Sequence, residues 1–309
     1  MERIYRGSFA VVVAALLWSL DGLLRRELYS LPPSVVVFWE HLLGIVILLP
    51  IIIWSLREYK KFTRKQWFSI ILVSGLSGAL GTYFYTSALA QVQYIPYSVV
   101  VLLQQLQPLF AITAGAILLR EPLSKRFLLY AVIALGAAYL VSFPDVRVNF
   151  ETGHGTIVAV VFALAAAAAW GSSTAFSKYT LHGTSFLHTT AARFAFTPLF
   201  ALALTFFLGY GSDLGNISPV QWKYLLIITF STGLVALSIY YYGLQRIFAS
   251  RATLLELTWP ISATLTGFFF LHERMTWTQV VGILVLLVTM IAIIREERKS
   301  EKGLPIEPL

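Results

Sequence analysis

The sequence has 309 residues, of which 58% are hydrophobic and only 12% charged, and its mean hydropathy is +0.75. One soluble core cannot bury that much apolar surface, so the composition excludes an ordinary soluble domain and indicates an integral membrane protein. The net charge of +8 does not indicate nucleic-acid binding, because the basic residues lie in short loops and not on one continuous face. The chain has no cysteine, which excludes disulfides and cysteine-ligated metals.

Apolar runs of membrane-spanning length follow one another along the chain. A helix needs about 20 residues to cross a hydrocarbon core of roughly 30 Å. The runs cover residues 7–24, 34–56, 66–90, 98–119, 126–142, 156–177, 186–208, 221–245, 250–271 and 278–294. Their many small residues favour close helix packing over β-barrel strands. We therefore expect an all-α integral membrane fold with ten transmembrane helices. The first run continues into Asp21 without a cleavage site, so we interpret it as a retained helix and not a signal peptide.

The second half of the chain repeats the first. The segments 98–121 and 250–273 carry identical residues at several equivalent positions, among them Pro108 and Pro260. The same spacing aligns Trp18 with Trp170, and a spacing three residues longer aligns Tyr85 with Tyr240. A fixed period of this kind indicates a tandem duplication. We expect a first repeat over 1–145, a linker over 146–155, a second repeat over 156–298 and a tail over 299–309.

The distribution of basic residues predicts the orientation. If the N-terminus is cytoplasmic, most of the 23 lysines and arginines fall on the inner side of the membrane, and few, Arg25 and Arg26 among them, fall on the outer side. This bias predicts that both termini are cytoplasmic in a plasma or inner membrane. Because five helices per copy is an odd number, the two repeats must be inverted. Inverted repeats give two near-equivalent states around a shared site at the midplane, which is the basis of alternating access.

Several local patterns resemble a known family. They are Ala168-Ala169-Trp170-Gly171 followed by Lys178, Arg193 in the seventh predicted helix, and the two helices that contain proline and end in glutamate. Together with the duplicated five-helix unit, this arrangement resembles the EamA-type halves of the drug/metabolite transporter superfamily across nearly the whole chain. The resemblance implies a secondary carrier, often an exporter of small metabolites. Ser19, His41, Arg120 and His272 depart from the pattern of the family.

Five ionisable residues lie within predicted helices, where a charge costs roughly 2.5–3.5 kcal/mol on insertion scales. They are Asp21, Glu40, His41, Arg193 and Glu256. Arg193 and Glu256 fall at similar depths, so we expect them to pair or to lie close together in one polar pocket. The inversion predicts a mirror site with Glu40, His41 and Gln104, with Asp21 nearby. A histidine beside carboxylates suits proton coupling, but the same residues could also simply join helices.

Other residues are candidates for the wall of a cavity. Buried indoles need an N–H partner, which makes Trp18 and Trp170 candidates for substrate contact, with plain packing as the alternative. Gln104 and Gln107 add amides to an apolar helix, and Pro108 and Pro260 are expected to free backbone carbonyls one turn earlier, at Gln104 and Glu256. Three more residues have two possible roles. Tyr85 and Tyr240 could contact the substrate or anchor the protein at the membrane interface. Lys178 could act as a gate or could extend its charged end to the interface, as lysines at helix ends commonly do.

We therefore predict a secondary transporter, an exporter of small metabolites such as amino acids, with proton coupling as an expectation. The predicted partners are a small-molecule substrate, the lipid bilayer and protons, with a monomer plausible, no cofactor, no metal and no nucleic acid. A non-transporting membrane interaction or lipid-handling protein is the alternative. An intramembrane enzyme is a less favoured alternative, because the sequence has no zinc-binding motif and no nucleophile-elbow motif. It also has no Walker motif, which argues against direct use of ATP.

Overall fold

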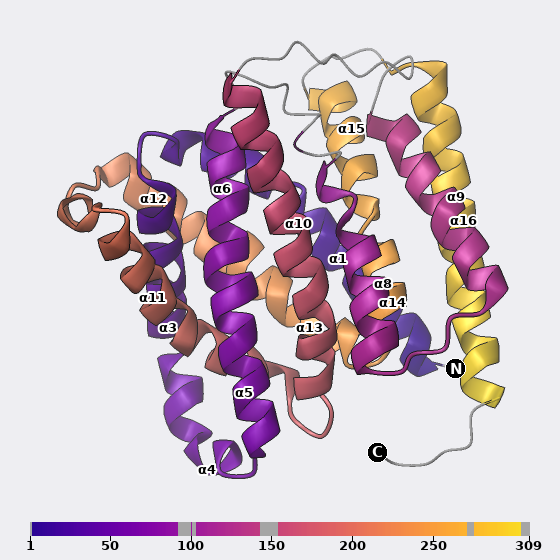
Figure 1. The fold of residues 1–309 in the computed structure, drawn as a ribbon, viewed down its shortest axis with the longest axis horizontal. Helices are drawn as coiled ribbons and strands as arrows, with labels where there is room; N and C mark the ends of the chain where they lie inside the picture. The colour runs from indigo at the N-terminus through magenta and orange to yellow at the C-terminus, as the bar shows by residue number, and fades with distance from the viewer. Residues whose placement is uncertain (1, 92–99, 101–102, 143–153, 271–274, 304–309) are drawn as a thin grey trace.

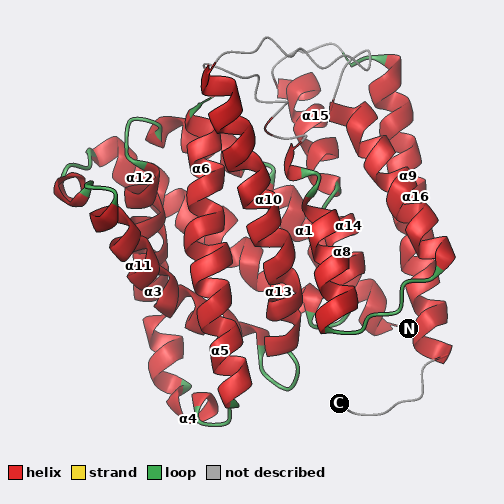
Figure 2. Cartoon of the chain, viewed as in Figure 1, coloured by secondary structure: helices red, strands yellow, loops and turns green. Residues whose placement is uncertain are grey.

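The computed structural model describes residues 2–91, 100, 103–142, 154–270 and 275–303. Every regular element in these ranges is a helix (Figure 2). The helices of the first half are α1 (Glu2–Trp18), α2 (Asp21–Arg25), η1 (Arg26–Leu28), α3 (Pro33–Trp54), α4 (Leu56–Tyr59), α5 (Arg64–Val73), η2 (Ser74–Gly81), α6 (Thr82–Ala90), α8 (Gln107–Leu118) and α9 (Lys125–Ser142).

The second half follows the same order of elements. Its helices are α10 (His154–Thr180), α11 (Phe186–Phe207), η4 (Gly211–Gly215), α12 (Pro219–Ile228), η5 (Thr229–Val235), α13 (Ala236–Leu244), α14 (Ala249–Leu255), α15 (Thr258–Phe270) and α16 (Trp277–Gly303). Most of the predicted linker lies outside the described residues. The C-terminal helix α16 continues to Gly303, beyond the predicted start of the tail.

Eight stretches of helix within the described part of the chain are long and apolar enough to cross a membrane. The two predicted spans that are not among them are the fourth and the ninth, which are equivalent in the two repeats. In the fourth span the helix is interrupted at Gln105 and Leu106, and in the ninth at Glu256 and Leu257. Each of these two predicted spans is therefore divided in the described residues, and the count of ten transmembrane helices stays a prediction. The interruptions lie just before Pro108 and Pro260, where a proline fits the first turn of a new helix better than the interior of an old one.

A second irregularity is also repeated. The segments η2 and η5 are π-helices, and they begin at equivalent positions, Ser74 and Thr229. Each lies between two α-helical segments of the third span of its repeat. Small residues dominate η2, and Gly78 lies so close to the Thr197 side chain that a Cβ atom would be 2.3 Å from its Oγ1. The π segment therefore belongs to a tight contact with α11 in the other repeat.

The contacts between helices have the symmetry of a duplicated chain. Two pairs of equivalent helices pack on each other: α3 on α11 and α9 on α16. Other contacts are reciprocal, since α1 packs on α13 and its equivalent α10 packs on α6. Figure 1 shows α9 beside α16 and α3 beside α11. The two halves are thus interleaved as one bundle, and their interface lies in its middle.

The helix ends repeat this symmetry in detail. Gln66 and Gln221 each complete a capping box at the start of a third span. The Gln66 Nε2 donates to the His182 carbonyl at 2.9 Å, and the Gln221 Nε2 donates to the Ser30 Oγ at 2.9 Å. Each glutamine therefore binds the turn after the first span of the opposite repeat.

One end of the bundle gathers the segments that the charge distribution places in the cytoplasm. Figure 1 shows the start of α1, the helix α4, the start of α5 and the lower end of α16 at the same end of the molecule. This arrangement requires an even number of crossings between the two ends of the chain. It agrees with two termini on one side, and the assignment of that side to the cytoplasm stays a prediction from the basic residues.

Candidate functional site

A cavity of about 210 Å³ lies between the two repeats. Every predicted site residue except Lys178 lines it: Trp18, Asp21, Glu40, His41, Tyr85, Gln104, Gln107, Trp170, Arg193, Tyr240 and Glu256. The lining comes from the first, second, third, fourth, sixth, seventh, eighth and ninth spans. The cavity is therefore a product of the interface and belongs to neither repeat alone.

Two aromatic pairs face this cavity, and the alignment of the two repeats makes them equivalent to each other. Trp18 and Tyr240 have ring centroids 5.1 Å apart, and Trp170 and Tyr85 also have centroids 5.1 Å apart. In each pair one residue comes from the first repeat and the other from the second. Tyr85 and Tyr240 are buried, with only 5% of each exposed. Both line the cavity, a buried position that does not fit the alternative of interfacial anchors, and their contact with a substrate stays a prediction.

The π-helices supply hydrogen-bond acceptors for the partly buried indoles of Trp18 and Trp170. The Trp18 Nε1 donates to the Thr232 carbonyl of η5 at 2.9 Å, and the Trp170 Nε1 donates to the Ser77 carbonyl of η2 at 3.0 Å. A π-helix shifts the register of backbone hydrogen bonds, which is why such segments recur at functional sites. Here both repeats use the π segment in the same way, to hold a tryptophan of the other repeat against the cavity.

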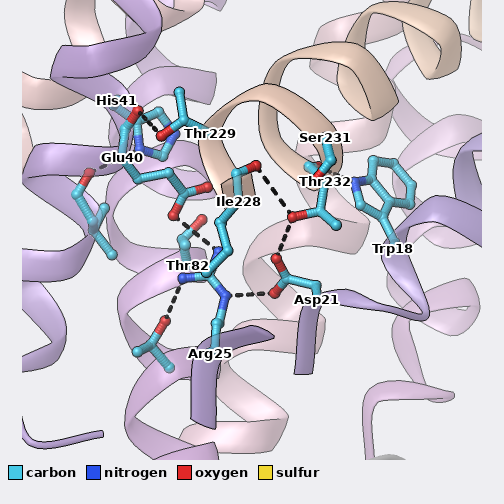
Figure 3. Close-up of polar contacts among 12 residues, drawn as sticks. Trp18, Asp21, Arg25, Glu40, His41, Thr82, Ile228, Thr229, Ser231 and Thr232 are labelled. Atoms are coloured by element: carbon cyan, nitrogen blue, oxygen red, sulfur yellow. Dashed lines mark hydrogen bonds and ion pairs between the residues drawn. The ribbon is translucent and has the colours of Figure 1, made fainter. Parts of the chain in front are cut away.

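A buried ionic cluster occupies one side of the cavity, with Arg25 at its centre (Figure 3). The Arg25 Nη2 lies 2.9 Å from the Glu40 Oε2, and its Nε lies 2.5 Å from the Asp21 Oδ2. The Nη1 donates to the Thr86 Oγ1 at 3.3 Å, and the Thr232 hydroxyl donates to the Asp21 Oδ1. Arg25 is only 3% exposed, so its placement with the outer loop charges is wrong.

The cluster joins elements that are distant in the sequence. Asp21 and Arg25 stand one turn apart on α2, Glu40 comes from α3, and the two threonines come from α6 and η5. Two carboxylates share one guanidinium, so the ionised cluster carries one excess negative charge. Such a group is stable in an apolar environment only when its hydrogen bonds are satisfied as these are.

His41 lies beside this cluster but does not bond to it. Its Nδ1 is 2.9 Å from the Val37 carbonyl, one turn back on α3, and its ring centroid is 5.0 Å from that of Phe194 on α11. The hydrogen bond at Nδ1 therefore ties the ring to its own helix and not to Glu40. His41 and Glu40 face the same cavity, as the mirror-site prediction expected, while the ion pair of Glu40 goes to Arg25.

Arg193 is the equivalent of His41 in the second repeat, and it also lines the cavity. Its Nη1 donates to the Tyr241 hydroxyl at 3.0 Å, and its Nη2 donates to the Ser77 hydroxyl at 2.9 Å. Among the described residues no carboxylate lies within 4.0 Å of this guanidinium. Arg193 and Glu256 share the cavity, as expected, but they do not form the ion pair that we offered as one possibility.

Glu256 is held by neutral donors at the interruption of the ninth span. Its Oε1 accepts a hydrogen bond from the Tyr240 hydroxyl at 2.7 Å, and its Oε2 accepts one from the Gln107 Nε2 at 2.8 Å. The backbone carbonyl of Glu256 accepts the Trp259 N–H at 2.9 Å, so it retains one hydrogen bond within its own segment. Binding of a ligand by this carbonyl stays a prediction.

The remaining two candidates differ in position. The Gln104 Nε2 donates to the Ala163 carbonyl at 2.7 Å, while its Oε1 is buried without a hydrogen-bond partner. Lys178 lies outside the cavity lining. Its Nζ donates to the carbonyls of Leu244 and Gln245 at 2.8 and 3.1 Å, at the C-terminus of α13, where a cation is favoured by the helix dipole.

Comparison with known proteins decides the family. A family model described as the EamA-like transporter family matches residues 5–143 and 157–295. This chain belongs to the EamA-like transporter family. It is accordingly a multi-pass membrane transporter and not an enzyme, and its two matched segments contain the two sets of helices described above.

Individual relatives of this EamA-like protein have named activities. It is 32% identical to the riboflavin transporter ImpX of Fusobacterium nucleatum subsp. nucleatum, over 95% of this chain and 99% of that one. It is 26% identical to the pseudopaline exporter CntI of Pseudomonas aeruginosa, over 57% of this chain and 58% of that one. A solved crystal structure with 17% identity superimposes with a TM-score of 0.74 over 96% of this chain and 98% of the other, which supports the fold.

The sequence pointed to eleven of the residues that line the cavity and missed others, among them Arg25, Tyr241 and Ser77. Arg25 was counted with loop charges, although its position one turn after Asp21 is a pairing signal that could have placed it. Tyr241 and Ser77, which orient Arg193, carry no signal by themselves. Their roles appear only when the two repeats are interleaved.

Proposed function

We propose that this transporter carries riboflavin, or a closely related flavin, across the membrane by alternating access through the central cavity. The observation that carries the proposal is the pair of aromatic contacts, Trp18 with Tyr240 and Trp170 with Tyr85, which face one cavity from opposite sides. A relative that matches almost the whole chain is named as a riboflavin transporter, which supports the same substrate.

The chemistry of the cavity suits a flat heterocycle with a polar rim. The isoalloxazine ring of riboflavin has two aromatic faces, and indole and phenol rings stack against such faces. Its rim has carbonyl acceptors and an N–H donor, and its ribityl chain has hydroxyl groups. Gln107, Glu256 and Arg193 offer donors and acceptors for these groups within the same cavity. A few polar groups in an aromatic pocket are the usual means of orienting a small ligand.

Amino acids, the substrates expected from the sequence, remain the second candidate. The cavity contains one guanidinium and one carboxylate that are not paired with each other, Arg193 and Glu256. These groups could receive the carboxylate and the ammonium of a zwitterion. Export as the direction of transport has support from the exporter among the relatives.

The substrate assay uses the purified protein in detergent and in liposomes. We expect riboflavin to bind the purified protein and to enter liposomes only when they contain it. Amino acids should not compete with riboflavin for binding or uptake. Trp18→Leu and Trp170→Leu should each weaken binding about tenfold, because each removes a stacking surface. Trp54→Leu is the matched control, since Trp54 is 90% exposed on the outer surface of the bundle. Competition by amino acids with no effect of riboflavin would overturn the proposed substrate.

Proton coupling is tested on Glu256. We propose that this carboxylate, held by Tyr240 and Gln107, is the group that exchanges a proton during the cycle. An imposed pH gradient should then accelerate riboflavin flux through the wild type, and Glu256→Gln should abolish that acceleration. If the pH gradient still accelerates uptake by the Glu256→Gln variant, Glu256 is not the coupling residue.

One chain is proposed as the transporting unit. The cavity is formed by the two repeats of a single chain, so that no second copy is needed to complete it. Lipid surrounds this unit, because large apolar side chains such as Phe9, Trp54 and Phe207 are exposed on its outside. Cross-linking and light scattering in detergent should find a monomer that retains riboflavin binding.

A further inference from the structure

Arg193 differs from the other two buried or cavity-facing arginines that the structure describes in detail. Arg25 has two carboxylate partners, and Arg251 has Glu296 at 3.4 Å together with the Phe127 ring 4.1 Å from its guanidinium carbon. Arg193 has only two neutral hydroxyl groups, and its buried Nε has no hydrogen-bond partner. A guanidinium has five N–H donors, so Arg193, which lines the cavity, retains donors beyond the two that bind Tyr241 and Ser77.

The neighbours of Arg193 hold it in one orientation. Tyr241 binds its Nη1, and the Tyr241 hydroxyl is itself 3.0 Å from the Ser177 Oγ. Ser77 binds its Nη2 from the π-helix η2, the segment whose carbonyl also holds Trp170. The guanidinium and the aromatic pair are therefore placed by the same element. A fixed fork of donors next to a stacking surface is suited to the edge of a planar ring.

The charges around the cavity indicate which kind of acceptor fits. Its ionisable lining residues are three acids, Asp21, Glu40 and Glu256, and two arginines, Arg25 and Arg193, with His41 in addition. When the acids are ionised the site already has one more negative than positive charge. An anionic ligand would increase that excess in a medium of low dielectric, whereas a neutral ligand with carbonyl oxygens would not.

We propose that Arg193, oriented by Tyr241 and Ser77, is the subsite that binds the pyrimidine-dione edge of a neutral flavin ring, through hydrogen bonds from the guanidinium to a ring carbonyl oxygen. This inference rests on the proposed function and extends it to the orientation of the ring. It assigns the transporter a preference for riboflavin over its phosphate ester, flavin mononucleotide. It also predicts rejection of flat tricyclic compounds that lack the dione, such as phenazine.

The test is a double-mutant cycle between protein and ligand, measured as flavin binding to purified protein. The ligand change is riboflavin to 2-thioriboflavin, in which sulfur replaces the oxygen at C2 and accepts hydrogen bonds poorly. The protein change is Arg193→Gln. A charge-assisted hydrogen bond of this kind corresponds to about a 10- to 100-fold change in binding. We expect each single change to weaken binding by that amount and the second change to add little, because both remove one contact.

Two further measurements keep the result clear. Arg246→Gln is the control, because Arg246 stacks on Tyr242, 3.5 Å from the ring centroid, outside the cavity lining. If Arg193→Gln does not fold, the vibrational frequency of the flavin C2 carbonyl bound to the wild type replaces it. A shift to lower frequency on binding is expected from a guanidinium donor.

The outcomes separate this inference from the proposed function. Absence of riboflavin binding to the wild type would contradict the proposed function itself. Riboflavin binding that Arg193→Gln leaves unchanged, or 2-thioriboflavin and flavin mononucleotide binding as tightly as riboflavin, would overturn the assignment of Arg193 and leave the proposed function standing.

Discussion

At the scale of single residues, the buried charges show how far the sequence can be read. The positions of Asp21, Glu40 and His41 within apolar helices predicted a polar site, because charges in the bilayer need a partner or a role. What the sequence could not show is which partner each one takes. Glu40 binds Arg25, from the neighbouring span, and not His41 beside it in the chain. That choice depends on how α2 and α3 pack, which is a tertiary property.

The Arg25 cluster gives a prediction about stability. Removing Arg25 leaves two carboxylates buried together, whereas removing one carboxylate leaves a balanced pair. We expect Arg25→Gln to destabilise the protein by about 3–5 kcal/mol and Asp21→Asn by clearly less. Adding Asp21→Asn to Arg25→Gln should recover part of the loss, because one charge then remains in place of two. Thermal unfolding in detergent measures all three. Equal losses in the two single variants would contradict the charge argument.

At the scale of elements, the duplication predicted most of the helices but not their irregularities. Apolar length was sufficient to predict the spans that cross without interruption. Pro108 and Pro260 predicted a disturbance of their helices, but the interruption before each proline and the π-helices at Ser74 and Thr229 were not predicted. A π-helix has no propensity signal of its own. It is stabilised here by contacts from the other repeat, such as the indole of Trp170 on the Ser77 carbonyl.

The contact between α3 and α11 gives a prediction at this scale. A Cβ atom on Gly44 would lie 2.2 Å from the ring of Phe194, which is 1% exposed and has no free space to move into. We expect Gly44→Ala to destabilise the protein by about 1–3 kcal/mol through overpacking. It should also weaken flavin binding, because Phe194 is the neighbour of both His41 and Arg193.

Gly136 on α9 is the matched control for this glycine. No atom lies within 4 Å of the Cβ position there, and the residue is exposed. Gly136→Ala should leave the melting temperature unchanged or raise it slightly, since alanine is the better helix former. Equal destabilisation by both substitutions would show that the loss comes from the helix backbone and not from the contact with Phe194.

The remote capping of α14 by Glu121 gives a third prediction. Its two carboxylate oxygens accept the backbone N–H groups of Ala249 and Ser250 at 2.6 and 2.9 Å, at the start of the helix that leads to Glu256. We expect Glu121→Ala to cost about 1–2 kcal/mol through lost capping and Glu121→Gln to cost less. The melting temperature of the two variants measures the difference. No loss in Glu121→Ala would contradict the capping role.

At the scale of the whole molecule, the inverted repeats and the cavity between them together support the proposed alternating-access mechanism. The reciprocal contacts, α1 on α13 and α10 on α6, support the proposal that the two halves exchange roles between two packings. The wall of the cavity is not symmetric, however. Arg25 is paired with two carboxylates, whereas Arg193 has only neutral hydrogen-bond partners. The repeated framework supplies the motion, and the positions where the repeats differ are proposed to select the substrate.

Counterflow measures this central claim most directly. Liposomes that contain the protein are loaded with unlabelled riboflavin and diluted into a trace of labelled riboflavin. An alternating-access carrier exchanges one for the other, so we predict that the label accumulates transiently inside above its outside concentration and then declines. The overshoot should disappear when the unlabelled riboflavin is left out. Labelled riboflavin that only equilibrates, with no overshoot at any internal concentration, would contradict the account.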